Sequence, residues 1–194
     1  MTKRLLIRNF AEDDYHDLYE YLSDKETYKF EPGKPITIET AKNLCNKRSK
    51  NNKFLAIQLK HKVIGHIYFA QMKPQKLLTW EVGFIFNKKY QGKGYAIESL
   101  TAIIEYGFEN KNIHKIIAHC NPKNVSSWKL LERIKMKREG KLRENIYFNK
   151  DGKGNPIWLD TYEYGLRKSE LGITLGKYRK AGHIVEKVSE YQEL

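Results

Sequence analysis

Residues Trp80–Glu98 read WEVGFIFNKKYQGKGYAIE, a β-patterned run followed by a glycine-containing turn and then by a helical pattern. Val82, Phe84 and Phe86 alternate with the intervening residues, and this period of two in a run rich in β-formers predicts a strand. Gly83 lies inside that run, where a glycine is typical of a bulge or of a close approach by another backbone segment. The stretch therefore predicts a strand, a turn and a helix in direct succession.

The turn itself predicts an anion-binding site. Its two glycines can present backbone N–H groups, and the helix that follows has apolar residues at helical spacing, namely Ile97, Leu100, Ile104 and Phe108. Free N–H groups and the positive end of a helix favour a phosphate or pyrophosphate. An ordinary strand-to-helix turn is the alternative. The candidate anion-binding residues are Gln91, Gly92, Lys93, Gly94, Tyr95 and Ala96.

The spacing of the glycines excludes two common phosphate loops. A Walker loop that began at the first glycine would need a second Gly five residues on, and a dinucleotide fingerprint would need Gly or Ala there, but that residue is Ile97. The remaining pattern, Gln-x-x-Gly-x-Ala at Gln91, Gly94 and Ala96, resembles the acyl-CoA pyrophosphate loop of the GNAT acetyltransferase superfamily. A second GKG, at Gly152–Gly154, has no helix after it and is typical of a hairpin turn.

Composition points to one globular domain. The 194 residues are enough for a sizeable core, and a hydrophobic fraction of 40% argues against disorder. Cys45 and Cys120 lie far apart without a partner pattern, so neither a disulfide framework nor a zinc site is expected. The sequence has no signal-peptide pattern and no apolar run near the roughly 20 residues of a membrane span, which favours a cytoplasmic protein without a membrane partner.

The formal net charge of +13 favours an anionic partner, such as a nucleotide, a nucleic acid, the ribosome or an acidic protein. The alternative is a solvated basic surface, because the lysines are scattered from Lys3 to Lys187 rather than gathered in one block. No nucleic-acid motif of recognisable spacing is present, so direct binding to nucleic acid is not expected.

The rest of the chain predicts an α/β (α+β) fold with the element order β-α-α-β-β-β-α-β-α-β-β. This order extends the GNAT resemblance across about residues 3–167, and the resemblance implies a mixed, mostly antiparallel sheet with helices on both faces. We expect residues 1–167 to form the GNAT domain and residues 168–194 to be a C-terminal extension. In that extension, Tyr178, Ile184, Val185 and Val188 belong either to an apolar stripe or to a frayed basic tail.

A second site element lies in residues Cys120–Phe148, CNPKNVSSWKLLERIKMKREGKLRENIYF. Asn124 directly precedes the expected helix and can cap it, which puts Ser127 in the first turn. The pattern N-x-x-S, followed by LLER and EGKLRE, resembles the GNAT branch that acetylates the N-terminal alanine or serine of ribosomal proteins. That resemblance implies that Asn124 contacts the cofactor, that Ser127 lies near its thiol, and that Glu144 is a base.

Two positions depart from the family pattern. Leu131 stands where many members have a tyrosine general acid, so Ser127 or water would have to protonate the leaving thiolate. Lys135–Met136 replaces the usual Gly-Phe after the helix, which puts the local turn in question.

The resemblance implies that acetyl-CoA, without a metal, delivers its acetyl group directly to a primary amine. Glu144, with Glu81 as second candidate, would take the ammonium proton, and Ser127 would protonate the sulfur. Each of these residues also has a structural alternative. Glu144 is otherwise a solvent-facing strand residue, Glu81 an ion-pair partner of a lysine, and Ser127 an ordinary residue in the first turn of a helix. The candidate ligands of the pantetheine arm and the acetyl oxygen are the backbone N–H groups of Phe84, Ile85 and Phe86.

The acceptor amine is the least defined part of this interpretation. An α-amine, with a pKa of about 7.7–8.0 against about 10.4 for lysine, needs only a modest carboxylate base, which favours a protein N-terminus. The positive net charge disfavours polyamines and aminoglycosides unless a local acidic pocket overrides it, and it favours an acidic protein or a ribosomal context. The rivals are a small-molecule amine acetyltransferase and a non-catalytic CoA-binding or ribosome-associated module. A homodimer is also compatible with the sequence.

Overall fold

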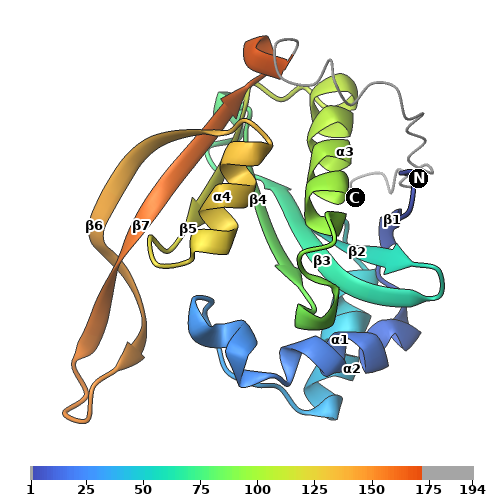
Figure 1. Ribbon diagram of the computed structural model, residues 1–194, viewed down its shortest axis with the longest axis vertical. Coiled ribbons are helices and arrows are strands. Elements are labelled where there is room, and N and C mark those ends of the chain that lie inside the picture. The colour runs from blue at the N-terminus through green and yellow to red at the C-terminus, as the bar shows by residue number, and fades with distance from the viewer. Residues whose placement is uncertain (1, 172–194) are drawn as a thin grey trace.

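The computed structural model describes residues 2–171, which form one sheet with helices on both faces (Figure 1). The strands are β1 (Leu6–Asn9), β2 (Phe54–Leu59), β3 (Lys62–Gln71), β4 (Thr79–Phe86), β5 (Lys115–Cys120), β6 (Lys137–Lys150) and β7 (Pro156–Arg167). The α-helices are α1 (Tyr15–Leu22), α2 (Ile38–Ser49), α3 (Tyr95–Asn110) and α4 (Val125–Arg133). Short 3-10 helices are η1 (Glu12–Asp14), η2 (Lys25–Lys29), η3 (Gln75–Leu77), η4 (Lys88–Tyr90) and η5 (Lys168–Glu170). The predicted order of strands and helices is confirmed.

The sheet has seven strands in the order β1-β2-β3-β4-β5-β7-β6. Every neighbouring pair is antiparallel except β4 and β5, which are parallel. The expectation of a mixed, mostly antiparallel sheet is therefore confirmed. The crossover that a parallel pair requires is supplied by α3, which follows the glycine-containing turn.

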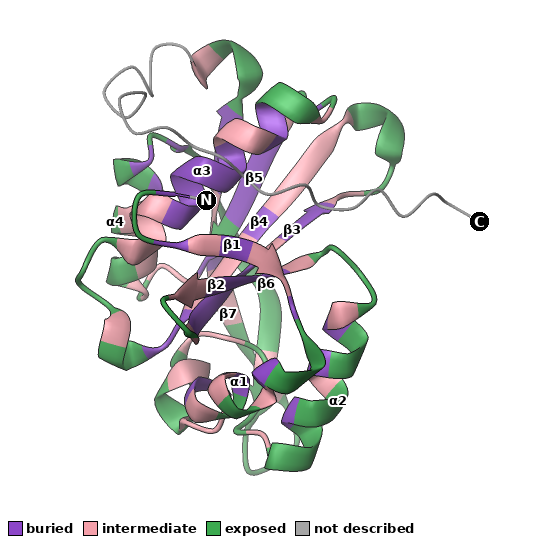
Figure 2. Ribbon diagram, turned by 90° about the vertical axis from the view of Figure 1, so that its right-hand side faces the viewer, coloured by how far each residue is buried: buried purple, intermediate pink, exposed green. Residues whose placement is uncertain are grey.

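The two pairs of helices cover opposite faces of the sheet. Helices α3 and α4 pack on the face that carries Val82 and Ile116, and together they form the larger buried cluster. Helices α1 and α2 pack on the other face, around Tyr21, Cys45 and Val63. Figure 2 shows α3 largely buried, whereas α2 exposes most of its residues. Each fully buried Leu, Ile or Phe side chain contributes about 1.5–3 kcal/mol, so α3 is anchored far more firmly than α2.

The parallel pairing of β4 with β5 is short. It joins Thr79–Glu81 to Lys115–Ile117 and stops there, although β4 runs on to Phe86 and β5 to Cys120. The two strands therefore diverge, and the edge of β4 that would face β5 is left without strand partners beyond Glu81.

The prediction of a bulge at Gly83 is wrong. The register of β3 with β4 runs without a shift over Trp80–Phe86, and a register shift occurs instead after Ile57 in β2. The close backbone approach belongs to Gly65, where an added Cβ would lie 2.6 Å from the carbonyl oxygen of Ile85. A glycine in a strand is a local signal that does not say which of two paired strands must come close.

The turn after α4 forms although Lys135 stands where the family pattern has a glycine. Met136 N–H donates to Leu131 O and Lys135 N–H donates to Glu132 O, both at 3.0 Å, which is the hydrogen-bond pattern of a Schellman motif. Lys135 adopts the left-handed conformation, with φ of 68°, that a glycine would take without strain. The lysine side chain is exposed and disturbs no packing, so the cost of having lysine instead of glycine here is the strain of its left-handed backbone.

Strands β6 and β7 form a long hairpin that projects from the body of the molecule (Figure 1). The second GKG is its turn, as predicted, with Asp151 N–H donating to Asn155 O at 2.8 Å and Gly154 N–H donating to Asp151 O at 3.0 Å. Residues 172–194, which include the expected apolar stripe, lie outside the described residues. No helix within residues 2–171 is long and apolar enough to cross a membrane.

We predict that Lys135→Gly stabilises the protein. Relief of the left-handed conformation is worth about 1–2 kcal/mol, and the greater freedom of glycine in the unfolded chain offsets about 0.4–1 kcal/mol of it, which leaves about 0.5–1 kcal/mol. Urea unfolding monitored by circular dichroism measures the change. Lys47→Gly, the same substitution inside α2, should destabilise by about 1 kcal/mol. A Lys135→Gly protein less stable than the parent would contradict the strain argument.

Candidate active site

The anion-binding turn lies at the N-terminus of α3. Gly92 and Gly94 adopt left-handed conformations, with φ of 75° and 79°, and Gly94 is the N-cap of the helix. Among the described residues, no protein acceptor takes the N–H groups of Gly92 to Ile97. These N–H groups and the helix dipole together favour an anion such as a pyrophosphate.

Gln91 fixes this turn to the end of β4. Its side-chain Nε2 donates to the carbonyl oxygen of Phe86 at 3.0 Å, so the amide bonds to the strand. Asn87 also stabilises the end of β4. Its Oδ1 accepts from Lys89 N at 3.0 Å, and its Nδ2 donates to Glu20 Oε1. The geometry of the turn thus depends on side chains that come from the strand end and from α1.

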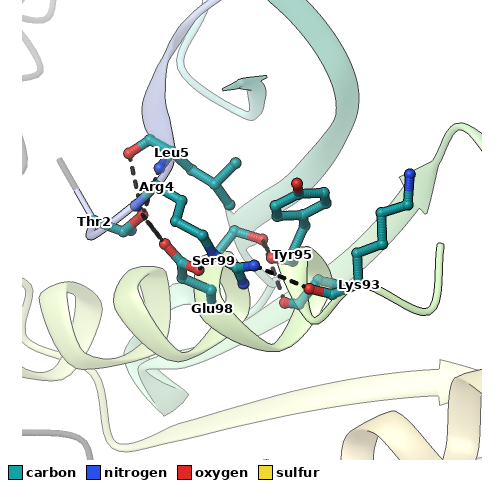
Figure 3. Close-up of polar contacts among 8 residues, drawn as sticks. Thr2, Arg4, Leu5, Lys93, Tyr95, Glu98 and Ser99 are labelled. Carbon is teal, nitrogen blue, oxygen red and sulfur yellow. Dashed lines mark hydrogen bonds and ion pairs between the residues drawn. The ribbon is translucent and has the colours of Figure 1, made fainter. Parts of the chain in front are cut away.

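A cluster formed by Thr2, Arg4 and Glu98 ties the N-terminal segment of the chain to the first turn of α3 (Figure 3). Glu98 accepts hydrogen bonds from Thr2 Oγ1 at 2.6 Å, from Arg4 N at 2.8 Å and from Arg4 Nε at 2.6 Å. Arg4 also donates to Lys93 O at 3.1 Å and stacks on Tyr95 with 4.5 Å to the ring centroid. Burial raises the pKa of Glu98, but the hydrogen bonds from Thr2 and Arg4 outweigh burial and lower this pKa overall. The carboxylate therefore stays charged beside the positive end of the helix.

The N-terminus of α4 faces the same region. Asn124 is the N-cap, as predicted, and its Oδ1 accepts from Ser127 N at 3.2 Å and from Ser126 Oγ at 3.0 Å. The carboxamide oxygen is therefore occupied, whereas the Asn124 NH₂ group has no partner among the described residues. Asn124 is held in place and still has two N–H donors for a ligand.

Backbone donors line the gap between the diverging strands. Met72 N–H donates to Thr79 O at 2.8 Å, and Asn87 N–H donates to Ile64 O at 2.9 Å. These two bonds fix the alternation, so that odd-numbered residues of β4 bond to β3 and the N–H groups of Phe84 and Phe86 point toward the gap. The divergence of β5 frees them, without a distortion at Gly83, whereas the N–H group of Ile85, which was also predicted as a donor, faces β3 and is not available.

A cleft of about 550 Å³ joins these parts. Its walls come from β4, η2 and the residues after it, the turn before α3, the first turn of α3, and α4 along its length. It is lined by all the predicted cofactor-binding residues except Lys93, namely Phe84, Ile85, Phe86, Gln91, Gly92, Gly94, Tyr95, Ala96 and Asn124, and by Ser127. Lys93 does not line the cleft: its ammonium group donates to Lys89 O at 3.1 Å, and Figure 3 shows the side chain extended away from the Glu98 cluster.

The two carboxylates predicted as bases are not among the residues that line this cleft. Glu144 is exposed on β6 at a register irregularity, where its backbone has φ of 46° and its N–H donates to Asp160. Glu81 is the last residue of β4 paired with β5, and its Oε1 lies 3.1 Å from His119 Nδ1. His119 Nε2 contacts Glu163 at 3.1 Å, and the bond to Glu81 followed by that to Glu163 raises the pKa of His119.

Three carboxylates that the sequence analysis did not single out line the cleft, namely Asp24, Glu26 and Glu31. Glu31 follows η2 in the segment between α1 and α2. It is half-buried, and burial raises its pKa to about 7. No local pattern marks this residue, because its neighbours in the cleft come from β4 and α4.

Comparison with known proteins identifies related chains. Residues 4–137 match the family model for the acetyltransferase (GNAT) domain. The uncharacterized N-acetyltransferase YnaD of Bacillus subtilis is 41% identical over 87% of this chain and 96% of its own. The crystal structure of a GNAT-family acetyltransferase from Bacillus anthracis has a TM-score of 0.80 at 36% identity and covers 88% of this chain and 98% of its own.

Two further relatives differ in the acceptors that their names give. The Escherichia coli [ribosomal protein uS5]-alanine N-acetyltransferase is 26% identical over 75% of this chain and 81% of its own. Spermidine N-acetyltransferase from Vibrio cholerae, solved with CoA and spermine, has a TM-score of 0.72 at 20% identity and covers 87% of this chain and 98% of its own. The second likeness is one of fold, and the two together leave the acceptor undecided.

We predict that Glu98→Gln destabilises the protein at pH 7 by about 1–3 kcal/mol, because the change weakens charge-assisted hydrogen bonds from Thr2 and Arg4. The pKa of Glu98 is lowered in the folded state, so its contribution is present above the usual carboxyl pKa and is lost as the pH falls through the lowered value. Urea unfolding at pH 7 and pH 4 measures the difference. Glu109→Gln, at an exposed position of the same helix, is the control. Equal losses at both pH values would contradict the prediction.

Proposed function

The chain belongs to the GNAT acetyltransferase family and is an acetyl-CoA-dependent N-acetyltransferase, and we propose that it acetylates the α-amine of a protein N-terminus. The observation that carries the proposal is the cleft, in which an unfilled helix N-terminus, free strand N–H groups and the capped start of α4 converge. These groups match the successive parts of acetyl-CoA, which are pyrophosphate, pantetheine and thioester.

Each part of the cleft has a role in this proposal. The N–H groups from Gly92 to Ala96 bind the pyrophosphate, and the cationic side chains of Lys88, Lys129 and Arg133 on the same cleft add charge complementarity. The N–H groups of Phe84 and Phe86 bind pantetheine and the acetyl oxygen, which polarises the carbonyl for attack. They are fixed by the pairing of β4 with β3, so little reorganisation is needed on binding.

Ser127 is the proposed donor to the departing sulfur. Its backbone N–H is used by the Asn124 cap, but no partner of its hydroxyl is found among the described residues. The residue lies in the first turn of α4 and lines the cleft, beside the N-cap that the resemblance assigns to cofactor binding. A hydroxyl at this place is free to donate to sulfur, which supports Ser127 or a water bound to it in place of the missing tyrosine.

An open part of the sheet supports a peptide acceptor. Helices α1 and α2 pack over β1 to β3, and within residues 2–171 no helix packs over Glu81, His119 and Glu163, which lie half-buried or exposed on the same face of β4, β5 and β7. Ile85 lies on this face and also lines the cleft. A peptide could therefore place its N-terminal amine at the gap and lay its following residues on the open face. The likeness to the uS5-alanine acetyltransferase supports the same class of acceptor.

A small-molecule acceptor is the second candidate, and a specific observation favours it. The wall of the cleft formed by the α1–α2 segment carries three carboxylates, Asp24, Glu26 and Glu31, against one cation, Lys29, and is net negative. A local acidic wall of this kind can override the positive net charge of the chain and attract a polyamine.

We predict that Gly94→Glu weakens acetyl-CoA binding at least about tenfold, since each 1.4 kcal/mol corresponds to a factor of ten. Gly94 has φ of 79° and forms the cap of α3, so a side chain there strains the turn and a carboxylate repels the pyrophosphate. Isothermal titration calorimetry with acetyl-CoA measures the change. Gly152→Glu, in the second GKG, has open space around the added side chain and is the matched control. A folded Gly94→Glu protein with unchanged affinity would overturn the pyrophosphate assignment.

We predict that peptides beginning with a free alanine or serine are acetylated and that the same peptides with blocked N-termini are not. Release of the free CoA thiol from acetyl-CoA measures turnover, and mass spectrometry locates the acetyl group. Spermidine and a blocked peptide with an internal lysine complete the panel. Turnover with spermidine alone would replace the peptide proposal by the small-molecule one. Acetyl-CoA binding without turnover on any acceptor, including ribosomal proteins, would point to a non-catalytic module.

A further inference from the structure

Glu31 is a carboxylate on the wall of the cleft that no other group neutralises. It lies between η2 and α2 and lines the cleft together with Phe84 and Ser127, which come from β4 and α4. Among the described residues it has no hydrogen-bond donor and no ion-pair partner. A half-buried carboxylate without a partner is costly for a fold to keep, and such groups gather at functional sites.

Glu31 lines the same cleft as Phe84 and Phe86 of β4, and its charge acts on the end of β5. Cys120 is the last residue of β5 and is buried there. Burial raises the pKa of the Cys120 thiol to about 11, and the negative charge of Glu31 adds to the same shift. The charge of Glu31 is therefore felt at the end of β5, beside the N–H groups that are proposed to hold the thioester.

The other carboxylates near the gap are already engaged or lie elsewhere. Asp24 lines the cleft, but its side chain accepts from Glu26 N at 2.9 Å as the N-cap of η2. Glu26 is exposed. Glu81 contacts His119, and Glu144 stands on the projecting hairpin, and neither lines the cleft.

The ionisation of Glu31 suits a base at neutral pH. Burial alone raises its pKa to about 7, so that the carboxyl group is able both to accept a proton and to release it near neutrality. The other titratable groups on the walls of the cleft are Asp24, Glu26, Lys29, Lys88, Tyr90, Tyr95, Lys129 and Arg133. None of them forms an ion pair with Glu31, so the cations remain available to an anionic ligand.

We propose that Glu31 is the catalytic residue that accepts the proton of the acceptor ammonium group, an inference that rests on the proposed amine acetyltransferase function. The ammonium gives one proton to the Glu31 carboxylate and becomes a neutral amine. The nitrogen lone pair then forms the C–N bond at the thioester carbonyl carbon, and the C–S bond breaks. The second nitrogen proton goes to the thiolate by way of Ser127 or water, and Glu31 returns its proton to solvent.

The test is the pH dependence of turnover in Glu31→Gln, with the acceptor of the panel that turns over in the parent protein. We expect kcat of the parent to rise through about pH 7 and then level off, because Glu31 must be ionised to accept the proton. Glu31→Gln should lose about 100- to 10,000-fold in kcat, with a smaller change in KM for acetyl-CoA. Its kcat should also no longer show the rise through about pH 7, which we call the limb at pH 7. Its remaining activity should follow the ionisation of the amine itself.

Matched variants separate this role from its competitors. Glu26→Gln removes one negative charge from the same wall and should keep the limb at pH 7. Glu81→Gln and Glu144→Gln test the two carboxylates predicted from the sequence. If Glu31→Gln keeps the parent kcat and pH profile while either of these variants loses them, Glu31 is not the base and the acetyltransferase function stands. If the parent protein itself turns over no amine, the proposed function fails first.

A second measurement does not need an acceptor. Because the folded-state pKa of Glu31 is raised, ionisation of Glu31 destabilises the fold, and this loss is complete only above about pH 7. Glu31→Gln should therefore raise the melting temperature relative to the parent at pH 8 and not at pH 5. A carbon NMR titration of the Glu31 carboxyl should give a midpoint near 7. A midpoint near the ordinary glutamate value, with no pH-dependent stabilisation, would overturn the proposal.

Discussion

The separation of β4 from β5 is the constraint on which the rest of the site depends. The two strands pair in parallel over Thr79–Glu81 only, and then each continues with its own partners on its outer side. A strand edge left open inside a sheet would normally be a liability, because its N–H groups lose their hydrogen bonds. Here the open edge faces a cleft, so the donors that the fold leaves unpaired are available to a ligand.

The polar groups of the cleft differ between its walls. The N-terminus of α3 forms one part of the cleft, and the α1–α2 segment brings three carboxylates, Asp24, Glu26 and Glu31, and one cation, Lys29, to another wall. In the proposed reaction, the anionic cofactor is drawn to the N-terminus of α3 and the amine acceptor to the net negative wall. The net charge of the chain does not describe this division, because the acidic wall is a local feature of a basic protein.

Sequence reasoning predicted the parts that short-range patterns encode. The Asn124 cap and the Gly92–Gly94 turn are local, since the groups that bond to one another are within a few residues. The prediction of a bulge or close approach at Gly83 failed because close approach in a sheet depends on two strands. Here the neighbouring strand β3 supplies the glycine, at Gly65. Glu31 could not be predicted, since its burial and its neighbours arise only when η2, β4 and α4 meet. The same holds for the contact of Glu81 with His119.

The environment of the two thiols completes the argument for direct transfer. A thiolate is the nucleophilic form of cysteine, and burial raises the pKa of both Cys45 and Cys120 to about 11, so both stay protonated at neutral pH. Cys45 is in addition packed under α2, in the smaller core cluster. Neither thiol among the described residues is therefore activated to carry an acetyl group, which supports the proposal of direct transfer from the thioester to the amine. The proposed direct transfer requires both substrates in this one cleft, which contains the free N–H donors, the N-terminus of α3 and the wall that carries Glu31.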